Sequence, residues 1–150
     1  MNLTMKFQIA ASTRAPTVLL VEGDYDHVER LAPEIEREQK TDIFVATNVI
    51  EAVEQIGALT QINTLVLDCD LPCNDCLTIA AVFQEHFPMG KVVCASRLGR
   101  ERLKGNLASL ARHVESVCLP RPYSFSSLLL ALSQSGMFQN LNSKRDSING

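Results

Sequence analysis

The architecture can be inferred from one stretch of the chain, Thr64-Leu65-Val66-Leu67-Asp68-Cys69-Asp70-Leu71-Pro72. Residues 64–67 form a short apolar run, which is typical of a strand buried on both faces. Such a strand carries Asp68 to its carboxyl end, the edge where ligands and chemistry collect in open α/β sheets. Pro72 then stiffens the loop that leaves the strand. The stretch therefore predicts a carboxylate held in a fixed place at the mouth of a sheet.

Strand and helix patterns alternate five times along the chain, and this alternation sets the expected fold. Strands are predicted at residues 17–21, 43–46, 64–67, 91–96 and 117–119. Helices are predicted at residues 24–39, 48–57 and 76–86, around Leu103, Leu107 and Leu110, and at 125–132. Such alternation implies a parallel sheet with helices on both faces. We therefore expect a doubly wound, five-stranded α/β fold.

Local signals place the element ends. Asp24 and Asn48 can each accept hydrogen bonds from the first backbone N–H groups of a helix, so both are predicted N-caps. Gly57 is predicted to close the second helix. Pro33 predicts a kink or a break in the first helix, and Pro120 shortens the fifth strand.

Length and composition indicate one ordinary globular domain. The chain has 150 residues, 46% of them hydrophobic and 21% charged, with a net charge of −3. No apolar run approaches the ~20 residues of a membrane span. We expect a leader at 1–16, a domain at 17–136 and a disordered tail at 137–150. The tail is too short for a DNA-binding domain, so direct nucleic-acid binding is not expected.

The cysteine count indicates the redox compartment, and the charge distribution indicates where charged surfaces lie. An odd cysteine count without a secretory pattern indicates free thiols in a reducing cytoplasm. Residues 22–38 hold seven acids and two arginines, whereas residues 97–121 hold six basic groups and two acids. These blocks are either two solvated faces or an acidic pocket and a basic partner surface.

The predicted strand ends carry a constellation of polar groups. Glu22 and Asp24 follow the first strand, Asp68 the third, Ser96 the fourth and Arg121 the fifth. Carboxylates and backbone carbonyls suit Mg²⁺, and a hydroxyl and a guanidinium can hydrogen-bond phosphate oxygens. A carboxylate beside Mg²⁺ can itself act as a nucleophile and form an acyl phosphate.

Residues 17–136 resemble the receiver domain of bacterial two-component response regulators, a flavodoxin-like (βα)5 fold. The motifs that carry the resemblance are Val21-Glu22-Gly23-Asp24, the Asp68-to-Pro72 loop, Ser96 at a strand end, and Arg121-Pro122-Tyr123. The resemblance implies a signal-transduction protein, not an enzyme, that switches its protein–protein contacts. It also implies a histidine kinase or phosphotransfer protein as phosphoryl donor.

The resemblance assigns a role to each site residue. Asp68 would accept the phosphoryl group, and Ser96 and Arg121 would contact it. Glu22 and Asp68 would bind Mg²⁺ with the carbonyl of Asp70, and Asp24 would be a reserve ligand.

Several positions depart from the family pattern. Gly23 stands where the direct Mg²⁺ ligand is expected, and Arg121 replaces a lysine. Cys118 replaces the aromatic switch residue, and Arg97 follows Ser96 where a small residue is usual. Arginine keeps the charge of lysine but presents a planar fork. The alternative is therefore a pseudo-receiver that signals by binding without phosphorylation.

Two further interpretations concern the cysteines. Cys73 and Cys76 form a Cys-x-x-Cys pair after a strand, as in a thiol redox protein. Cys69, Cys73 and Cys76 with Asp70 or Asp75 could bind Zn²⁺, but a second ligand pair is missing. Cys94 and Cys118 read as small buried hydrophobic residues. The three histidines read as solvated side chains: His27, His86 and His113.

A partner surface is expected on the fourth helix, fifth strand and fifth helix. It would carry Arg100, Arg102, Lys104 and Leu130. A basic patch around an apolar centre fits an acidic downstream target or a homodimer.

Overall fold

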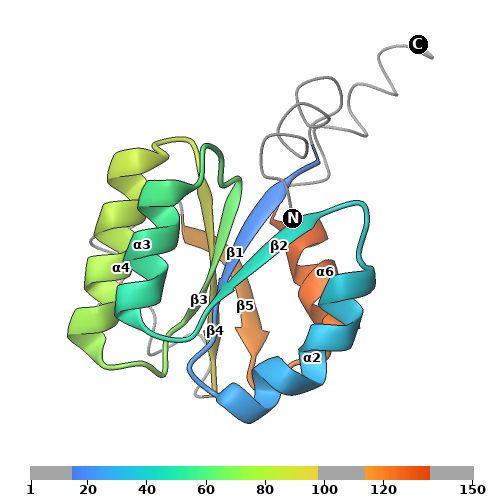
Figure 1. The fold of residues 1–150 in the computed structure, drawn as a ribbon. Coiled ribbons are helices and arrows are strands. Elements are labelled where there is room, and N and C mark those ends of the chain that lie inside the picture. The colour runs from blue at the N-terminus through green and yellow to red at the C-terminus, as the bar shows by residue number, and fades with distance from the viewer. Residues whose placement is uncertain (1–14, 98–113, 136–150) are drawn as a thin grey trace.

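A computed structural model describes residues 15–97 and 114–135, with only the backbone of residues 114–117 (Figure 1). The strands are β1 (Thr17–Val21), β2 (Asp42–Ala46), β3 (Thr64–Asp68), β4 (Lys91–Ser96) and β5 (Val114–Pro120). The helices are α2 (Tyr25–Arg37), α3 (Val49–Ala58), α4 (Cys73–His86) and α6 (Phe125–Gln134).

The five strands form one parallel sheet in the order β2-β1-β3-β4-β5. This order confirms the predicted doubly wound, flavodoxin-like α/β fold. Val21 is the register partner of Leu67, which is the partner of Cys94 on the next strand. The carboxyl ends of β1, β3 and β4 therefore lie side by side, at the lower edge of the sheet in Figure 1.

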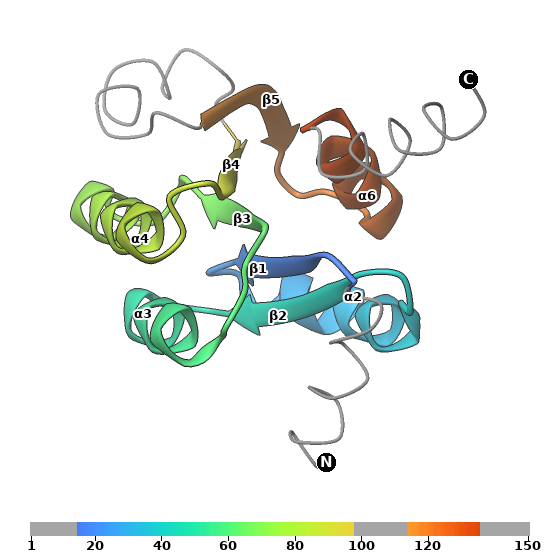
Figure 2. The same ribbon diagram turned by 90° about the horizontal axis from the view of Figure 1, so that it is seen from above.

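Helices cover both faces of the sheet. Helices α3 and α4 lie on one face and α2 and α6 on the other (Figure 2). Because side chains alternate along a strand, Leu19 and Leu67 join the core under α3 and α4. Leu20 and Val66 join the core under α2 and α6. Each such buried side chain stabilises the fold by about 1.5–3 kcal/mol.

The two predicted N-caps, Asp24 and Asn48, are confirmed. The Asp24 side chain accepts hydrogen bonds from the N–H groups of Asp26 and His27, and Asn48 accepts one from Glu51. Ser124 caps α6 through the N–H of Ser127. These caps satisfy backbone donors that the first helical turn leaves free.

Several features of the elements differ from the predictions. Helix α4 begins at Cys73, three residues before the predicted start, and Pro72 is its N-cap. Strand β5 reaches from Val114 to Pro120, longer than predicted. Gly57 lies inside α3, whose C-cap is Leu59. Helix α2 runs through Pro33 without a break.

Some predictions lie outside the described residues. These are the predicted helix around Leu103, Leu107 and Leu110, the tail at 137–150, and the leader except Ala15 and Pro16. The Pro16 carbonyl accepts a hydrogen bond from the N–H of Asp42, at 2.9 Å. Within the described ranges no helix has both the length and the apolar character needed to cross a membrane.

Candidate functional site

The loops at the carboxyl edge of the sheet bring together residues that are remote in sequence. Glu22 follows β1, Asp68 ends β3, Ser96 ends β4 and Arg121 follows β5. A pocket of about 330 Å³ opens at this edge. Its lining consists of Gly23, Asp24, Asp68, Asp70, Leu71, Pro72, Arg97 and Arg121. The structure thus assembles the predicted constellation in one place.

Arg121 lies at the centre of three carboxylates, those of Glu22, Asp68 and Asp70, which we call the acid cluster. Its Nε donates to Glu22 Oε2 at 3.2 Å, and its Nη2 donates to Glu22 Oε1. Its Nη1 lies 2.5 Å from Asp70 Oδ2 and 3.3 Å from Asp68 Oδ1. Burial disfavours the charge, but the hydrogen bonds with Glu22 and Asp70 outweigh it and raise the pKa of Arg121. The guanidinium is therefore a permanent cation.

Asp68 is enclosed by protein groups on both of its oxygens. Oδ2 accepts the N–H of Gly23 at 2.9 Å, and Oδ1 accepts the N–H of Asp70 at 2.9 Å as well as facing Arg121. The residue is 2% exposed. Burial raises the pKa of Asp68, and the nearby charge of Glu22 adds to this, against the hydrogen bonds and Arg121.

Asp70 contributes its side chain, whereas the sequence analysis assigned only its carbonyl. Its carboxylate accepts from Ser96 Oγ at 3.2 Å, from the N–H of Arg97 at 3.0 Å and from Arg121. Burial opposes ionisation of Asp70, but the hydrogen bond from Arg121 and the others outweigh it and lower its pKa. Asp70 therefore ties the ends of β4 and β5 to the loop after β3.

Asp24 and Arg97 stand at the border of the pocket. The Asp24 side chain is engaged as the N-cap of α2. The Arg97 side chain is 61% exposed, with Nη2 3.9 Å from Asp24 Oδ2. Ion pairs this exposed contribute little stability. The Asp24 side chain thus caps α2, while its backbone N–H donates to Glu22 Oε1 of the acid cluster at 3.2 Å.

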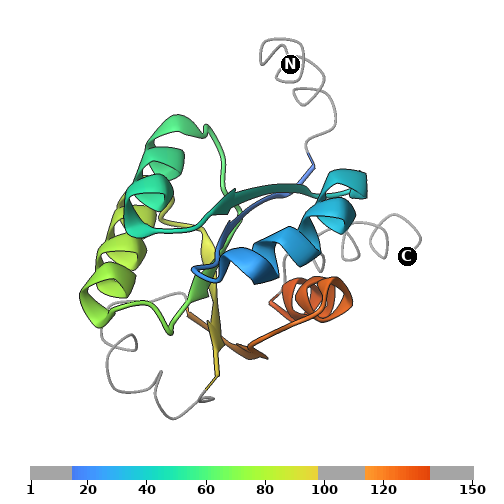
Figure 3. The ribbon, with the colours of Figure 1, turned by 60° about the horizontal axis from the view of Figure 1, so that its bottom comes forward.

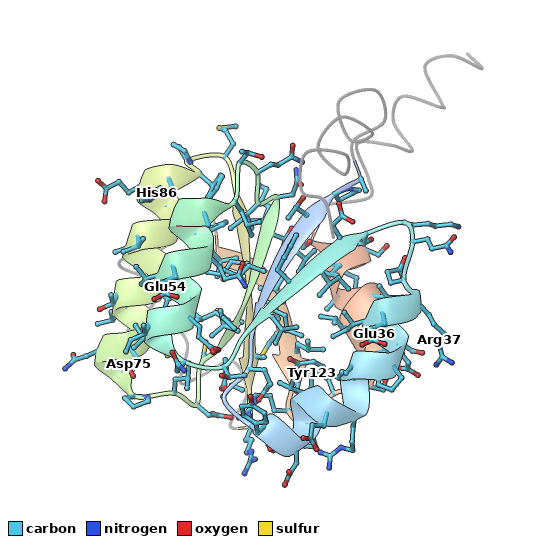
Figure 4. All side chains as sticks on the ribbon, in the orientation of Figure 1. Glu36, Arg37, Glu54, Asp75, His86 and Tyr123 are labelled. Atoms are coloured by element: carbon cyan, nitrogen blue, oxygen red, sulfur yellow. The ribbon has the colours of Figure 1, made fainter. Side chains whose placement is uncertain are left out.

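Two buried residues behind Glu22 were missed by the sequence analysis. The Tyr123 hydroxyl donates to Glu22 Oε2 at 3.1 Å, and His27 Nδ1 lies 3.6 Å from the same oxygen. His27 was predicted to be solvated, which is wrong, because it is 2% exposed. Figure 4 shows Tyr123 where β5 ends and α2 begins. The Pro-aromatic sequence after Arg121 hinted at Tyr123, whereas no local signal marked His27.

Mg²⁺ does not fit this donor set. Four of the six carboxylate oxygens in the acid cluster contact the Arg121 guanidinium. The other two, Asp68 Oδ2 and Asp70 Oδ1, accept hydrogen bonds from Gly23 and Ser96. Gly23 supplies an N–H donor, not an oxygen, and points it at Asp68. Across residues 15–97 and 114–135, no group of three or more His, Cys, Asp or Glu residues could hold a metal ion.

The cysteines do not form a redox pair of the predicted kind. Cys73 is exposed at the start of α4, and Cys76 is buried with its thiol donating to the Asp68 carbonyl at 3.3 Å. Burial raises the pKa of Cys76 to about 12, whereas a reactive thiol needs a lowered pKa. Cys94 is buried as predicted, and Cys118 is partly buried.

Of the residues named for the predicted partner surface, Arg100, Arg102 and Lys104 lie outside the described residues. His113, predicted to be solvated, also lies outside them. Leu130 on α6 is 59% exposed, as a docking residue requires.

No protein-family model and no curated protein matches the chain. Solved structures of response regulator receiver domains match most of it. A signal receiver domain of an HD domain-containing protein from Pseudomonas fluorescens is 20% identical, with a TM-score of 0.68, covering 85% of this chain and 98% of that one. A response regulator receiver domain protein from Methanospirillum hungatei is 14% identical, with a TM-score of 0.67 and coverage of 85% and 98%.

A third structure is informative for its ligands. A response regulator protein from Burkholderia pseudomallei, with a phosphorylated aspartic acid, calcium ion and citrate, is 18% identical. Its TM-score is 0.63, and the match covers 87% of this chain and 74% of that one. At these identities the likeness shows the fold, which is that of response regulator receiver domains.

Proposed function

We propose that this chain is a signal-transduction domain of the receiver fold that acts by binding other proteins, without phosphorylation of Asp68. One observation carries the proposal: both oxygens of Asp68 are held by protein groups, Gly23 on one side and Asp70 with Arg121 on the other. A nucleophilic carboxylate must present a lone pair to the phosphoryl donor. The contacts with Gly23, Asp70 and Arg121 compete with a phosphoryl donor for the oxygens of Asp68.

The loop beside Asp68 also supports a function without phosphorylation. The nearest side-chain neighbour of a Cβ built at Gly23 is Leu71, at 2.8 Å, so the Leu71 side chain lies over the loop beside Asp68. The Leu71 side chain and the Arg121 guanidinium thus both border Asp68, where a phosphoryl donor would have to approach. The receiver fold is retained, and Leu130 on α6 is exposed as a docking residue would be. We propose a histidine kinase, a phosphotransfer protein or a downstream target as partner.

Intact-mass measurement tests the proposal. The protein and its Asp68→Asn variant are incubated with acetyl phosphate and MgCl₂, beside a phosphorylatable receiver domain as positive control. We expect no gain of the phosphoryl mass of about 80 Da on this chain, while the control gains it. A gain in the wild type that is absent from Asp68→Asn would overturn the proposal.

The second candidate function is a phosphorylated receiver, with Asp68 as phosphoacceptor. A specific observation favours it, because Asp68 lines the open pocket together with Asp70 and Arg121, and Ser96 is hydrogen-bonded to Asp70. In this case Ser96 and Arg121 would release Asp70 to contact the phosphoryl group. The mass experiment separates the two candidates directly.

A further inference from the structure

We infer that Arg121 is the built-in cation of the acid cluster, in the place where a divalent cation would otherwise be needed, and that removing its guanidinium creates a cation-binding site. The inference goes beyond the proposed function, although both concern the same acid cluster. It concerns this chain's own residues, Glu22, Asp68, Asp70, Gly23 and Arg121.

The first argument is charge. The acid cluster places three carboxylates around one guanidinium, and the Arg121 and Glu22 side chains are 5% and 0% exposed. Buried carboxylates without a counter-charge are strongly destabilising, because their desolvation is not offset. The Arg121 guanidinium supplies that counter-charge at every pH at which the protein is folded.

The second argument is shape. A guanidinium is a planar fork with several donors, whereas an ammonium is a compact point charge. Nε and Nη2 engage the two oxygens of Glu22, while Nη1 faces Asp68 and Asp70. One lysine ammonium cannot span these three side chains in this way. The arrangement therefore explains why arginine stands at position 121.

The third argument is the space beside Gly23. A Cβ at residue 23 would lie 2.8 Å from Leu71 Cδ2 and 3.2 Å from Asp68 Oδ2. An acidic side chain there, which a divalent cation would use, has no room unless Leu71 moves. The Gly23 N–H instead donates to Asp68. Position 23 thus supplies the acid cluster with a hydrogen-bond donor and not with a further carboxylate.

Removing the guanidinium leaves oxygen ligands behind. Glu22, Asp68 and Asp70 would then be three carboxylates at one place, and such oxygens are the ligands that Ca²⁺ and Mg²⁺ prefer. The truncated side chain of an Arg121→Ala variant would leave the space of the guanidinium for the ion and its waters. We therefore expect metal dependence to appear in the variant and to be absent from the wild type.

The test compares melting temperatures in EDTA, MgCl₂ and CaCl₂ for the wild type, Arg121→Ala, Arg121→Gln and Arg121→Lys. Arg97→Ala is the matched control, because Arg97 is an exposed arginine at the same pocket. We expect the wild type and Arg97→Ala to melt alike, with no response to metal. Arg121→Ala and Arg121→Gln should melt roughly 10 °C lower in EDTA and regain part of this in CaCl₂ or MgCl₂.

Chemical rescue separates charge from packing. Guanidinium chloride at a sub-denaturing concentration should raise the melting temperature of Arg121→Ala relative to NaCl at equal ionic strength, and should not raise that of the wild type. Arg121→Lys should lie between wild type and Arg121→Ala, because one ammonium reaches fewer of the carboxylates.

Three outcomes overturn the inference. They are a wild type that is stabilised by metal as much as Arg121→Ala, variants without a metal response, and variants that fail to fold even with MgCl₂ and CaCl₂ present. A phosphoryl mass gain in the wild type would overturn the proposed function but not this inference. Metal-insensitive variants beside an unphosphorylated wild type would overturn only the inference.

Discussion

His27 Nε2 lies 2.7 Å from the carbonyl oxygen of Tyr123, 96 residues further along the chain. A carbonyl only accepts, so Nε2 carries the proton and donates. The two rings also meet edge to face, with centroids 4.5 Å apart. Figure 3 shows α2 and α6 side by side on this face of the sheet. The contact joins the first turn of α2 to the segment between β5 and α6.

Replacing His27 by Leu should destabilise the fold. The change leaves the Tyr123 carbonyl without its donor in a buried place, and an unsatisfied group of this kind costs about 1–3 kcal/mol. His86→Leu is the control, because His86 is exposed on α4 (Figure 4) and hydrogen-bonds only locally to Val82. Urea unfolding followed by circular dichroism measures both. Equal free energies of unfolding for the two variants would contradict the prediction.

Tyr123→Phe should lower stability through Glu22. The lost hydroxyl donates to a buried carboxylate, and a hydrogen bond to a charged group contributes about 1.5–3 kcal/mol. Tyr25→Phe removes the same hydroxyl from a residue that is 65% exposed, so its effect should stay within about 0.5 kcal/mol. Chemical denaturation of both variants provides the comparison. The idea fails if Tyr25→Phe proves as destabilising as Tyr123→Phe.

Gly23→Ala should destabilise the fold by overpacking. The new Cβ meets Leu71 at 2.8 Å, and overpacking typically costs about 1–3 kcal/mol. The double variant Gly23→Ala with Leu71→Ala should lose less stability than the sum of the single variants, because Leu71→Ala makes room.

Gly57→Ala is the matched control for this double-mutant cycle. Gly57 lies within α3 with no atom within 4 Å of a built Cβ. Alanine there should stabilise the helix by about 0.5–1 kcal/mol. Additive effects of the Gly23 and Leu71 changes would show that the two residues do not constrain each other.

The Glu51 carboxylate should make a pH-dependent contribution to the stability of the fold. Hydrogen bonds from the Thr47 hydroxyl and the Thr47 N–H lower the pKa of Glu51. A lowered pKa in the fold gives stability above the unfolded pKa of about 4.3, and this is lost as the pH falls through the folded pKa. Glu51→Gln should therefore be less stable than wild type at pH 7.

The comparison is repeated at decreasing pH. The gap between wild type and Glu51→Gln in urea unfolding should shrink as the pH falls below the unfolded pKa. Glu54→Gln, a change of an exposed acid on the same helix (Figure 4), is the control. A gap that stays constant with pH would rule out the carboxylate as its source.

The sequence predicted the fold where burial is strongest. Strands β1 and β3 are fully buried, and their runs of Val and Leu predicted buried strands at these positions. Two of the boundaries that were wrong involve proline. Pro72, whose fixed φ suits a helix start, allows α4 to begin directly after it. Pro120 pairs with Ser96 at the end of the edge strand β5, where a missing N–H is tolerated.

The sequence also predicted which residues lie close together at the carboxyl edge of the sheet, but not which contacts their side chains make. Strand order alone brings Glu22, Asp68, Ser96 and Arg121 to one edge. Whether Arg121 contacts carboxylates or awaits a phosphoryl group depends on its side-chain conformation, which no local pattern encodes. The burial of His27 likewise depends on packing against a segment 96 residues away.

The separation of Arg121 from Glu22 by 99 residues has a consequence for synthesis of the chain. A nascent chain makes both Glu22 and Asp68 long before residue 121 leaves the ribosome. Until then the acids repel one another, and the strands that carry them gain nothing by bringing them together. We therefore expect the carboxyl edge of the sheet to close last, when β5 docks. Truncated chains that end before β5 should be digested rapidly by protease, whereas the full chain should resist.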